Sequence, residues 1–397
     1  MDFTLTPEQD LIRRTCRDFA QQVIAPRAEE MDRTASFPYD IVAQMAQLGL
    51  MGLPFPEESG GAGADTVSYA LAVEEIARAD ASTGITMAAH ISLGASPFYL
   101  FGTEEQKQDY LVPLARGERL WAFGLTEPGA GSDAGATSTR AELRDGHWVV
   151  NGTKCFITNS GTRITGGVTI TALTAPPRPV RERGSGGEGA GGEGLRPEIS
   201  NLIIPSGTPG FNVAPSYHKM GWRASDTHEL SFRDCAVPEE NLLGARGNGL
   251  KQFLEILDGG RISVAALSVG LAQACYDAAF AYARERRQFG QPIARFQAIQ
   301  FKLADMATEI ELARLMTLKA AWLKDQGKDF RLAAGMAKLY AAETSKRAAD
   351  QAVQIHGGYG FMDEYAVSRY WRDCKINEIG EGTSEIQRLV IARLLGC

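Results

Sequence analysis

The chain has 397 residues, of which 44% are hydrophobic and 22% charged, and its formal net charge is -7. This length exceeds what one ordinary core holds, so we expect two or three domains. The negative charge argues against a nucleic-acid surface, and no stretch approaches about 18 uninterrupted apolar residues, which argues against a membrane span.

The N-terminus is acidic and lacks both the basic segment and the apolar run of a signal peptide. The six cysteines form no C-x-x-C pair, which indicates a reducing compartment with neither disulfides nor a zinc site. The five histidines form no H-x-x-x-H pair, which argues against a metal site. We therefore predict a cytoplasmic protein of the bacterial type, without a metal.

The first predicted domain (1–118) has a helical pattern throughout. Thr6 followed by Pro7 marks a helix start, because threonine is a good N-cap and proline suits the first helical position. Further helices are expected from residue 40 and over 65–79, 82–96 and 104–115. Small side chains dominate 82–96, which indicates tight helix packing or room for a ligand beside the helix.

The second predicted domain (119–238) has the pattern of short strands. Asp145 and Gly146 form a two-residue hairpin turn between strands at 138–143 and 147–150, and Asn151–Gly152 should turn the chain again into 153–158. Other strands are expected at 121–126, 168–173, 201–204, 211–213 and 229–232. This spacing indicates an antiparallel barrel or sandwich. Residues 176–197, rich in Gly, Arg, Glu and Pro, should form a surface loop.

In the third predicted domain (239–397) the helical period returns, with long amphipathic stretches at 250–258, 263–287, 297–326 and 330–355. In the third stretch, one face carries Ile299, Leu303, Met306, Ile310 and Ala313. Long helices joined by short loops predict a four-helix bundle. The predicted fold class is therefore α+β, with an N-terminal helical domain, a middle antiparallel β-domain and a C-terminal four-helix bundle.

Residues 127–134 contain the spacing G-x-G-x-x-A, which is typical of dinucleotide-binding loops. The Rossmann version requires a following helix, whereas a β-hairpin is predicted here. Such a loop between strands can still bind a pyrophosphate through backbone N–H groups, with the Ser132 hydroxyl as a further donor. Phe156 and Thr158, at the end of a predicted strand, suit a flat ring and its polar edge, although Phe156 alone fits a core position better.

Residues 377–388 combine a helix start with one isolated carboxylate. Ser384 is the expected N-cap, and Gln387 should complete a capping box. Gly380 and Gly382 flank Glu381, and glycines permit a close backbone approach or a positive φ. On these residues alone, an exposed acidic side chain on a turn is the favoured interpretation.

Six motifs in register change that interpretation: 125–133, 156–159, 220–227, 286–290, 354–358 and 381–388. Together they resemble the acyl-CoA dehydrogenase family over nearly the whole chain, and residues 301–307 resemble its short-chain, butyryl-type branch. The resemblance implies FAD between the β-domain and the bundle, in a homotetramer where each FAD contacts two subunits.

The resemblance also implies site residues. Those that would hold the pyrimidine edge and phosphates of FAD are Phe123, Leu125, Thr126 and Ser132, and those beside the isoalloxazine are Phe156 and Thr158. Those that would reach the FAD of a neighbouring subunit are Arg286, Gln288, Phe289, Gln354 and Gly358. Further implied cofactor residues are Gln297, Gly357, Thr383 and Glu385. The implied substrate contacts are Ser132, Asp258, Arg261 and Gly382.

Glu381 would be the base that removes the α-proton of an acyl-CoA while the β-hydride passes to the flavin. The thioester carbonyl then needs hydrogen-bond donors where enolate charge develops, and the N–H of Glu381 and a ribityl hydroxyl fill this role in the family. Burial should raise the pKa of Glu381, and the dipole of the following helix opposes that rise.

Two positions depart from patterns common in the family. Some branches carry the base immediately before the arginine that matches Arg261, and Gly260 at that place favours Glu381. Many relatives have tryptophan where Phe156 stands, so the smaller ring should cover the flavin less completely. Residues 176–197 are also longer than usual, and no substrate contact is inferred there.

The predicted activity is FAD-dependent dehydrogenation of a short-chain acyl-CoA to the trans-2-enoyl-CoA, with an electron-transfer flavoprotein as acceptor. One alternative is a branched-chain enzyme of the isovaleryl, isobutyryl or 2-methylbutyryl type. Others are an acyl-CoA oxidase, against which the length of 397 residues argues, and a non-catalytic flavin- or CoA-ester-binding protein, against which Glu381 argues.

Overall fold

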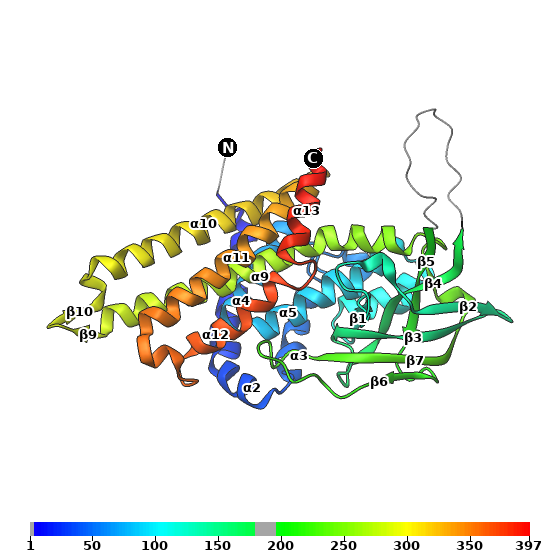
Figure 1. Ribbon diagram of the computed structural model, residues 1–397, viewed down its shortest axis with the longest axis horizontal. Coiled ribbons are helices and arrows are strands. Elements are labelled where there is room, and N and C mark those ends of the chain that lie inside the picture. The colour runs from blue at the N-terminus through cyan, green and yellow to red at the C-terminus, as the bar shows by residue number, and fades with distance from the viewer. Residues whose placement is uncertain (1–3, 179–195) are drawn as a thin grey trace.

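The computed structural model describes residues 4–178 and 196–397, whose elements follow one another as helices, strands and helices again. Figure 1 shows an elongated molecule with the main sheet at one end, the helices filling the centre and the other end, and a small hairpin at the tip opposite the sheet. This order confirms the predicted three-part architecture.

The N-terminal part is helical, as predicted. Its helices are α1 (Pro7–Phe19), α2 (Ala28–Thr34), α3 (Tyr39–Gln47), α4 (Thr66–Ala79), α5 (Ala81–Ala89), α6 (Ser96–Phe101), α7 (Glu104–Gln106) and α8 (Val112–Ala115). Thr6 caps α1, as expected. The helix predicted at 82–96 is α5 followed by a π-helical turn (His90–Ala95), and every residue of α5 is buried. Small residues permit this close packing, since a Cβ on Gly94 would lie 2.4 Å from the Trp121 carbonyl oxygen.

Within the described residues, eight strands form one sheet. They are β1 (Leu120–Gly124), β2 (Arg140–Arg144), β3 (His147–Thr158), β4 (Thr165–Arg178), β5 (Arg196–Pro205), β6 (Phe211–Val213), β7 (Thr227–Pro238) and β8 (Leu242–Leu243). Their order is β6-β7-β3-β2-β4-β5-β8, with β1 beside β4. Most neighbours are antiparallel, and β1 and β2 run parallel to β4. The predicted hairpin turn is confirmed, because Arg144 pairs with His147 across Asp145 and Gly146, both at positive φ.

The turn predicted at Asn151–Gly152 is wrong. β3 continues through both residues, and its pairing with β7 shifts between Val150 and Gly152. A Cβ on Gly152 would lie 2.4 Å from Thr139 Oγ1, so this glycine marks a bulge and a close approach. The loop predicted at 176–197 is strand at 176–178 and 196–197, and the remainder lies outside the described residues.

The C-terminal part contains α9 (Gly249–Glu285), α10 (Gln297–Asp325), α11 (Arg331–His356), α12 (Ala366–Cys374) and α13 (Ser384–Leu394). A small hairpin of β9 (Arg287–Gln288) and β10 (Gln291–Pro292) joins α9 to α10. The predicted core face of α10 is confirmed at Leu303, Met306, Ile310 and Ala313, which are buried, whereas Ile299 is partly buried against the same core.

The two helices predicted at 250–258 and 263–287 are one continuous helix of 37 residues, α9. Gly259 and Gly260, in the gap between them, are helical because packing outweighs the low helix propensity of glycine. α9 is apolar and long enough to cross a membrane by composition, and 67% of its most apolar window is buried inside the protein. It is the central core helix.

Hydrogen bonds fix the sheet against the helices. Asn159, just after β3, donates through Nδ2 to the Thr86 carbonyl of α5 at 3.0 Å. The N–H of Trp222 donates to the Asp373 carboxylate of α12 at 2.6 Å. These bonds hold the end of β3 and the 220–223 segment against the helical parts.

Candidate active site

A short loop before α13 carries the isolated carboxylate. Thr383 is the N-cap of α13, and its hydroxyl accepts from a backbone N–H three residues on. The prediction of Ser384 as N-cap is wrong, because Ser384 is already helical while Thr383 has the extended backbone of a cap. The Gln387 amide closes no capping box and instead donates to the carbonyls of Glu381 (3.4 Å) and Gly382 (3.2 Å).

The loop backbone is strained at the carboxylate. Glu381 has φ 52° and Gly382 φ 94°. A non-glycine residue in this region costs about 1–3 kcal/mol and persists only where its surroundings enforce it. Among the described residues, Glu381 Oε2 is buried without a hydrogen-bond partner, and the Glu381 N–H has no acceptor. One residue thus keeps a basic oxygen and an amide donor free, and the exposed-turn interpretation is wrong.

Burial and the neighbouring positive charges shift the pKa of Glu381 in opposite directions. Burial raises the pKa of its carboxyl to about 7, although the charges of Lys338 and Arg261 lower it. Lys338, on α11, is buried and donates to the Gly382 carbonyl at 2.7 Å. Arg261, on α9, is buried and paired with Asp258. Since a base works best with a pKa near the working pH, this carboxylate suits proton abstraction at neutral pH.

Gly260 makes room for the Glu381 side chain. A Cβ on Gly260 would lie 2.4 Å from Glu381 Oε2, closer than real Cβ contacts come. The absence of a side chain at Gly260 is therefore what allows the carboxylate its present position. The Gly260 departure noted in the sequence has a direct steric reason.

Five predicted cofactor residues meet at the ends of two strands: Phe123, Leu125 and Thr126 at β1, and Phe156 and Thr158 at β3. The Cys155 N–H donates to the Thr126 carbonyl at 2.9 Å, which holds the two segments side by side. Phe156 is 66% exposed at φ 61°, so it is not a core residue. An exposed aromatic ring in an enforced backbone is available to a flat ligand.

A buried ion pair beneath these strand ends was missed by sequence reasoning. Lys154 Nζ lies 2.7 Å from Glu127 Oε1 and donates to the Leu125 carbonyl at 3.1 Å. Burial alone would raise the pKa of Glu127, but the Lys154 charge and nearby hydroxyl groups hold it well below its usual range. The pair anchors the start of the glycine-rich loop. No sequence signal identifies it, because a strand lysine is normally solvated.

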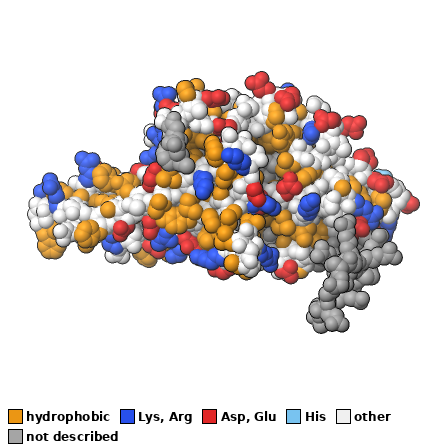
Figure 2. Space-filling model, turned by 90° about the horizontal axis from the view of Figure 1, so that it is seen from above, with side chains coloured by type: hydrophobic (Ala, Val, Ile, Leu, Met, Phe, Trp, Pro, Cys, Tyr) orange, Lys and Arg blue, Asp and Glu red, His pale blue; other side chains and the backbone are white. Residues whose placement is uncertain are grey.

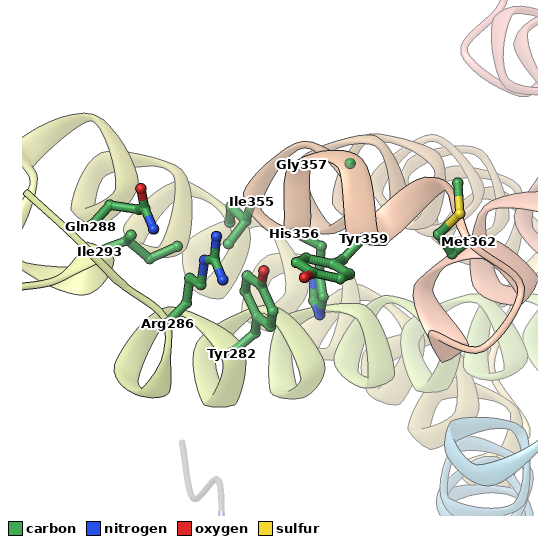
Figure 3. Close-up of a pocket in the computed structure, with 10 residues that line it drawn as sticks. Tyr282, Arg286, Gln288, Ile293, Ile355, His356, Gly357, Tyr359 and Met362 are labelled. Atoms are coloured by element: carbon green, nitrogen blue, oxygen red, sulfur yellow. The ribbon is translucent and has the colours of Figure 1, made fainter.

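Four other predicted cofactor residues line a hollow of ≈ 520 Å³: Arg286, Gln288, Gly357 and Gly358. In Figure 3, Arg286 and Gln288 come from the end of α9 and the following hairpin, and Gly357 from the end of α11. Phe289, at the hairpin tip, is 93% exposed at φ 50°. Gln297 and Gln354 are exposed and do not line this hollow.

The remaining predicted residues lie near the Glu381 loop, on α13 or on the glycine-rich loop. Gly382 and Thr383 belong to the Glu381 loop, and Asp258 and Arg261 lie on α9 close to it, whereas Glu385 is exposed on the first turn of α13. Ser132 is exposed on the glycine-rich loop. Figure 1 places the sheet and the β9–β10 hairpin at opposite ends of the molecule, so one copy does not unite the two cofactor sets.

Lys338 is a further residue that sequence reasoning missed. A signal for it exists: it shares a helix face with Ala334, Ala341 and Ser345, at the spacing of buried positions. A lone lysine on such a face indicates an internal partner, which here is the Gly382 carbonyl.

Models of the acyl-CoA dehydrogenase family match the chain in three parts: the N-terminal domain over 6–118, the middle domain over 122–235 and the C-terminal domain over 247–396. A probable acyl-CoA dehydrogenase of Bacillus subtilis is 57% identical over 395 residues, covering 100% of both chains. A short-chain specific acyl-CoA dehydrogenase of Clostridium acetobutylicum is 46% identical, covering 99% of both.

Solved structures agree with these matches. The butyryl-CoA dehydrogenase of Megasphaera elsdenii superposes with a TM-score of 0.93 at 42% identity, covering 100% of both chains. A chain in a structure solved for the electron-transferring flavoprotein of Acidaminococcus fermentans gives 0.92 at 45% identity, covering 100% of this chain and 99% of that one.

The cofactor follows from the same comparison. An acyl-CoA dehydrogenase from Bacillus anthracis, solved with FAD, gives a TM-score of 0.88 at 35% identity and covers 98% of this chain and 67% of its own. The exposed Phe156 ring and the arginine-bearing hollow fit a flavin ring and its phosphates. The chain therefore belongs to the acyl-CoA dehydrogenase family, the FAD-dependent oxidoreductases that dehydrogenate acyl-CoA thioesters.

Proposed function

We propose that the protein dehydrogenates a short-chain acyl-CoA to the trans-2-enoyl-CoA, with Glu381 as the base. One observation supports this most directly: Glu381 Oε2 is buried without a partner among the described residues. A buried carboxylate with a purely structural role is normally hydrogen-bonded. One without a partner, whose pKa burial raises to about 7, is a candidate general base.

The chain's own groups would carry the proton step. Glu381 Oε2 would take the α-proton, and the free N–H of the same residue would donate to the thioester carbonyl as negative charge develops there. Asp258, Arg261 and Ser132 would contact the CoA portion, and Gly382 would lie against the substrate.

When bound, FAD supplies the acceptor for the hydride that leaves the β-carbon. The residues that would hold it in one copy are Phe123, Leu125, Thr126, Ser132, Phe156, Thr158, Thr383 and Glu385. Those that would hold it from a neighbouring copy are Arg286, Gln288, Phe289, Gln297, Gln354, Gly357 and Gly358. The residues at the strand ends and the residues at the β9–β10 hairpin lie at opposite ends of one copy. A complete cofactor site would therefore need two copies.

Assembly into a homotetramer is supported by the surface of the helical end. Figure 2 shows hydrophobic side chains exposed along the narrow end of the molecule, and Phe280, Phe289 and Phe301 are among the exposed large hydrophobic residues of this part. Exposed apolar groups in such numbers favour burial by a partner. We further infer a cytoplasmic location and domains spanning 1–118, 119–238 and 239–397.

Substrate and acceptor are inferred from relatives. The Clostridium enzyme is described as short-chain specific and the Megasphaera enzyme as a butyryl-CoA dehydrogenase, which supports a short acyl chain. The match within the Acidaminococcus flavoprotein structure supports an electron-transfer flavoprotein as acceptor.

Anaerobic titration of the purified yellow protein with straight and branched acyl-CoAs tests this function. Bleaching of the flavin by butyryl-CoA, with no oxygen consumption in air, is the expected result. Bleaching only by isovaleryl- or isobutyryl-CoA would move the substrate to the branched class, and rapid oxygen consumption would indicate an oxidase. A flavin that no thioester bleaches would overturn the proposed activity.

The variant Glu381→Gln tests the base. It should keep FAD and remain reducible by dithionite, yet lose reduction by the acyl-CoA, because an amide cannot accept the α-proton. Glu343→Gln is the matched control, since Glu343 pairs with Arg388 on the surface and should not affect bleaching. Normal turnover of Glu381→Gln would show that another group is the base.

A further inference from the structure

Lys338 is a buried cation that contacts the Glu381 loop at the Gly382 carbonyl. Its side chain is 0% exposed, and burial lowers its pKa to about 8. Its Nζ donates to the Gly382 carbonyl at 2.7 Å, and among the described residues no carboxylate lies within ion-pair distance of it. A buried ammonium without a paired carboxylate is unfavourable, so an ordinary structural role does not account for it.

The other charged groups near the loop are already paired or exposed. They are Arg261 and Asp258 of α9, which pair with each other, Glu378 of the preceding turn, which pairs with Lys375, and Glu385 of α13, which is exposed. Tyr69 of α4 is buried, and burial raises the pKa of its hydroxyl, so it carries no charge at neutral pH. Glu381 is therefore the one group here that Lys338 influences and that has no other partner among the described residues.

We propose that Lys338 is a positioning residue for the base: its bond to Gly382 holds the left-handed turn, and its charge favours the ionised form of the Glu381 carboxylate. This rests on the proposed role of Glu381. The bond acts on Gly382 and the charge on Glu381, and these two adjacent residues, at φ 94° and φ 52°, form the left-handed turn. The Gln387 amide, at 3.2 Å from the same carbonyl, is a second support.

The proton step can be isolated from the redox step with acetyl-CoA. This thioester has α-hydrogens but no hydride-donating β-carbon. In D₂O its α-C–H bond would break as Glu381 takes the proton, the electron pair would move to the enolate, and return of a deuteron would form C–D. No electron acceptor is needed, and Lys338 itself exchanges no proton in the step. Mass spectrometry of acetyl-CoA then gives an exchange rate at each pH.

The experiment compares wild type, Lys338→Met and Lys338→Gln, each with its FAD. Without the ammonium, the pH at which the exchange rate levels off should rise by about one pH unit or more. At pH values below this inflection, the rate should fall about tenfold for each pH unit. Lys338→Gln keeps a donor for Gly382, so it should show the same upward move with a higher plateau than Lys338→Met. Lys346→Met is the control, because Lys346 lies on the surface of α11 and pairs with Asp350.

The outcomes separate the two proposals. Wild-type exchange whose inflection is unchanged in Lys338→Gln would overturn the role of Lys338 and leave that of Glu381 intact. A wild-type protein that exchanges no α-hydrogen and is bleached by no acyl-CoA would overturn both. FAD absorbance and thermal unfolding of each variant identify a folding defect, and Lys338→Gln carries the test if Lys338→Met does not fold.

Discussion

Replacing Gly260 with alanine should reduce activity strongly while leaving the fold as stable as before or more so. The added Cβ would lie 2.4 Å from Glu381 Oε2, and ordinary contact begins at 3.4 Å, so the carboxylate must retreat by about 1 Å. A misplacement of about 1 Å in a reacting group costs about 100-fold in rate. Stability should not fall, because the displaced atom ends a flexible side chain, and alanine favours a helix interior over glycine by about 0.5–1 kcal/mol.

The assay measures kcat/KM with an acyl-CoA, flavin content and thermal unfolding on the same samples. Gly259→Ala is the matched control, since its Cβ would meet Lys324 Nζ at 3.5 Å, an ordinary contact. It should gain the same helix stability without the loss of rate. A Gly260→Ala protein with wild-type kcat/KM would refute the reasoning, because either the carboxylate does not need its present position or it is not the base.

Three further predictions concern the pKa of Glu381, the Lys154–Glu127 pair and the exposed Phe289. The value of kcat/KM should rise with pH through about 7 and then level off, because burial raises the pKa of Glu381 to about 7 and only the ionised carboxylate accepts a proton. A pH profile that is flat across this range would contradict the assignment of Glu381 as the base. Lys154→Met should lower the unfolding free energy by about 3–5 kcal/mol in urea titration, because it leaves Glu127 buried without a counter-charge. The control variant Lys107→Met removes a surface ion pair and should cost less than about 1 kcal/mol. Equal unfolding midpoints for the two variants would refute this prediction. Phe289→Ser should reduce both flavin content and assembly size in analytical ultracentrifugation, and a yellow tetramer with full flavin would count against the two-copy site.

Glycines explain most of the differences between sequence prediction and structure. The sequence pattern located some elements closely: the stretch predicted at 297–326 is α10 (Gln297–Asp325), and the strand predicted at 211–213 is β6 (Phe211–Val213). It failed at Gly152 and Gly260, because a glycine required for close approach has the same sequence signature as one required for a turn. In both cases the neighbour, Thr139 or Glu381, is known only from the fold.

The candidate site was predictable in outline because its motifs are local. Thr383 instead of Ser384 as N-cap is a shift of one residue, decided by the backbone at the Glu381 turn. Lys154 and Lys338 were out of reach for a different reason. Their partners lie 27 and 44 residues away in the chain, and a buried lysine contradicts the ordinary preference of that side chain for water.

Because α9 is continuous, it fixes the spacing between three parts of the molecule. At 37 residues it is about 55 Å long. It carries Phe253 against Phe123 of β1, then Gly260 and Arg261 beside the base, and it ends at Glu285, directly before Arg286, which lines the hollow. A substitution along α9 changes one of these contacts at a time. Deleting a single residue between Phe253 and Gly260 would instead rotate the two ends by about 100° relative to each other and shorten their separation by about 1.5 Å. A change in the length of this helix would therefore displace its contacts with β1, with Glu381 and with the hollow relative to one another, even though the contacting side chains themselves are unchanged.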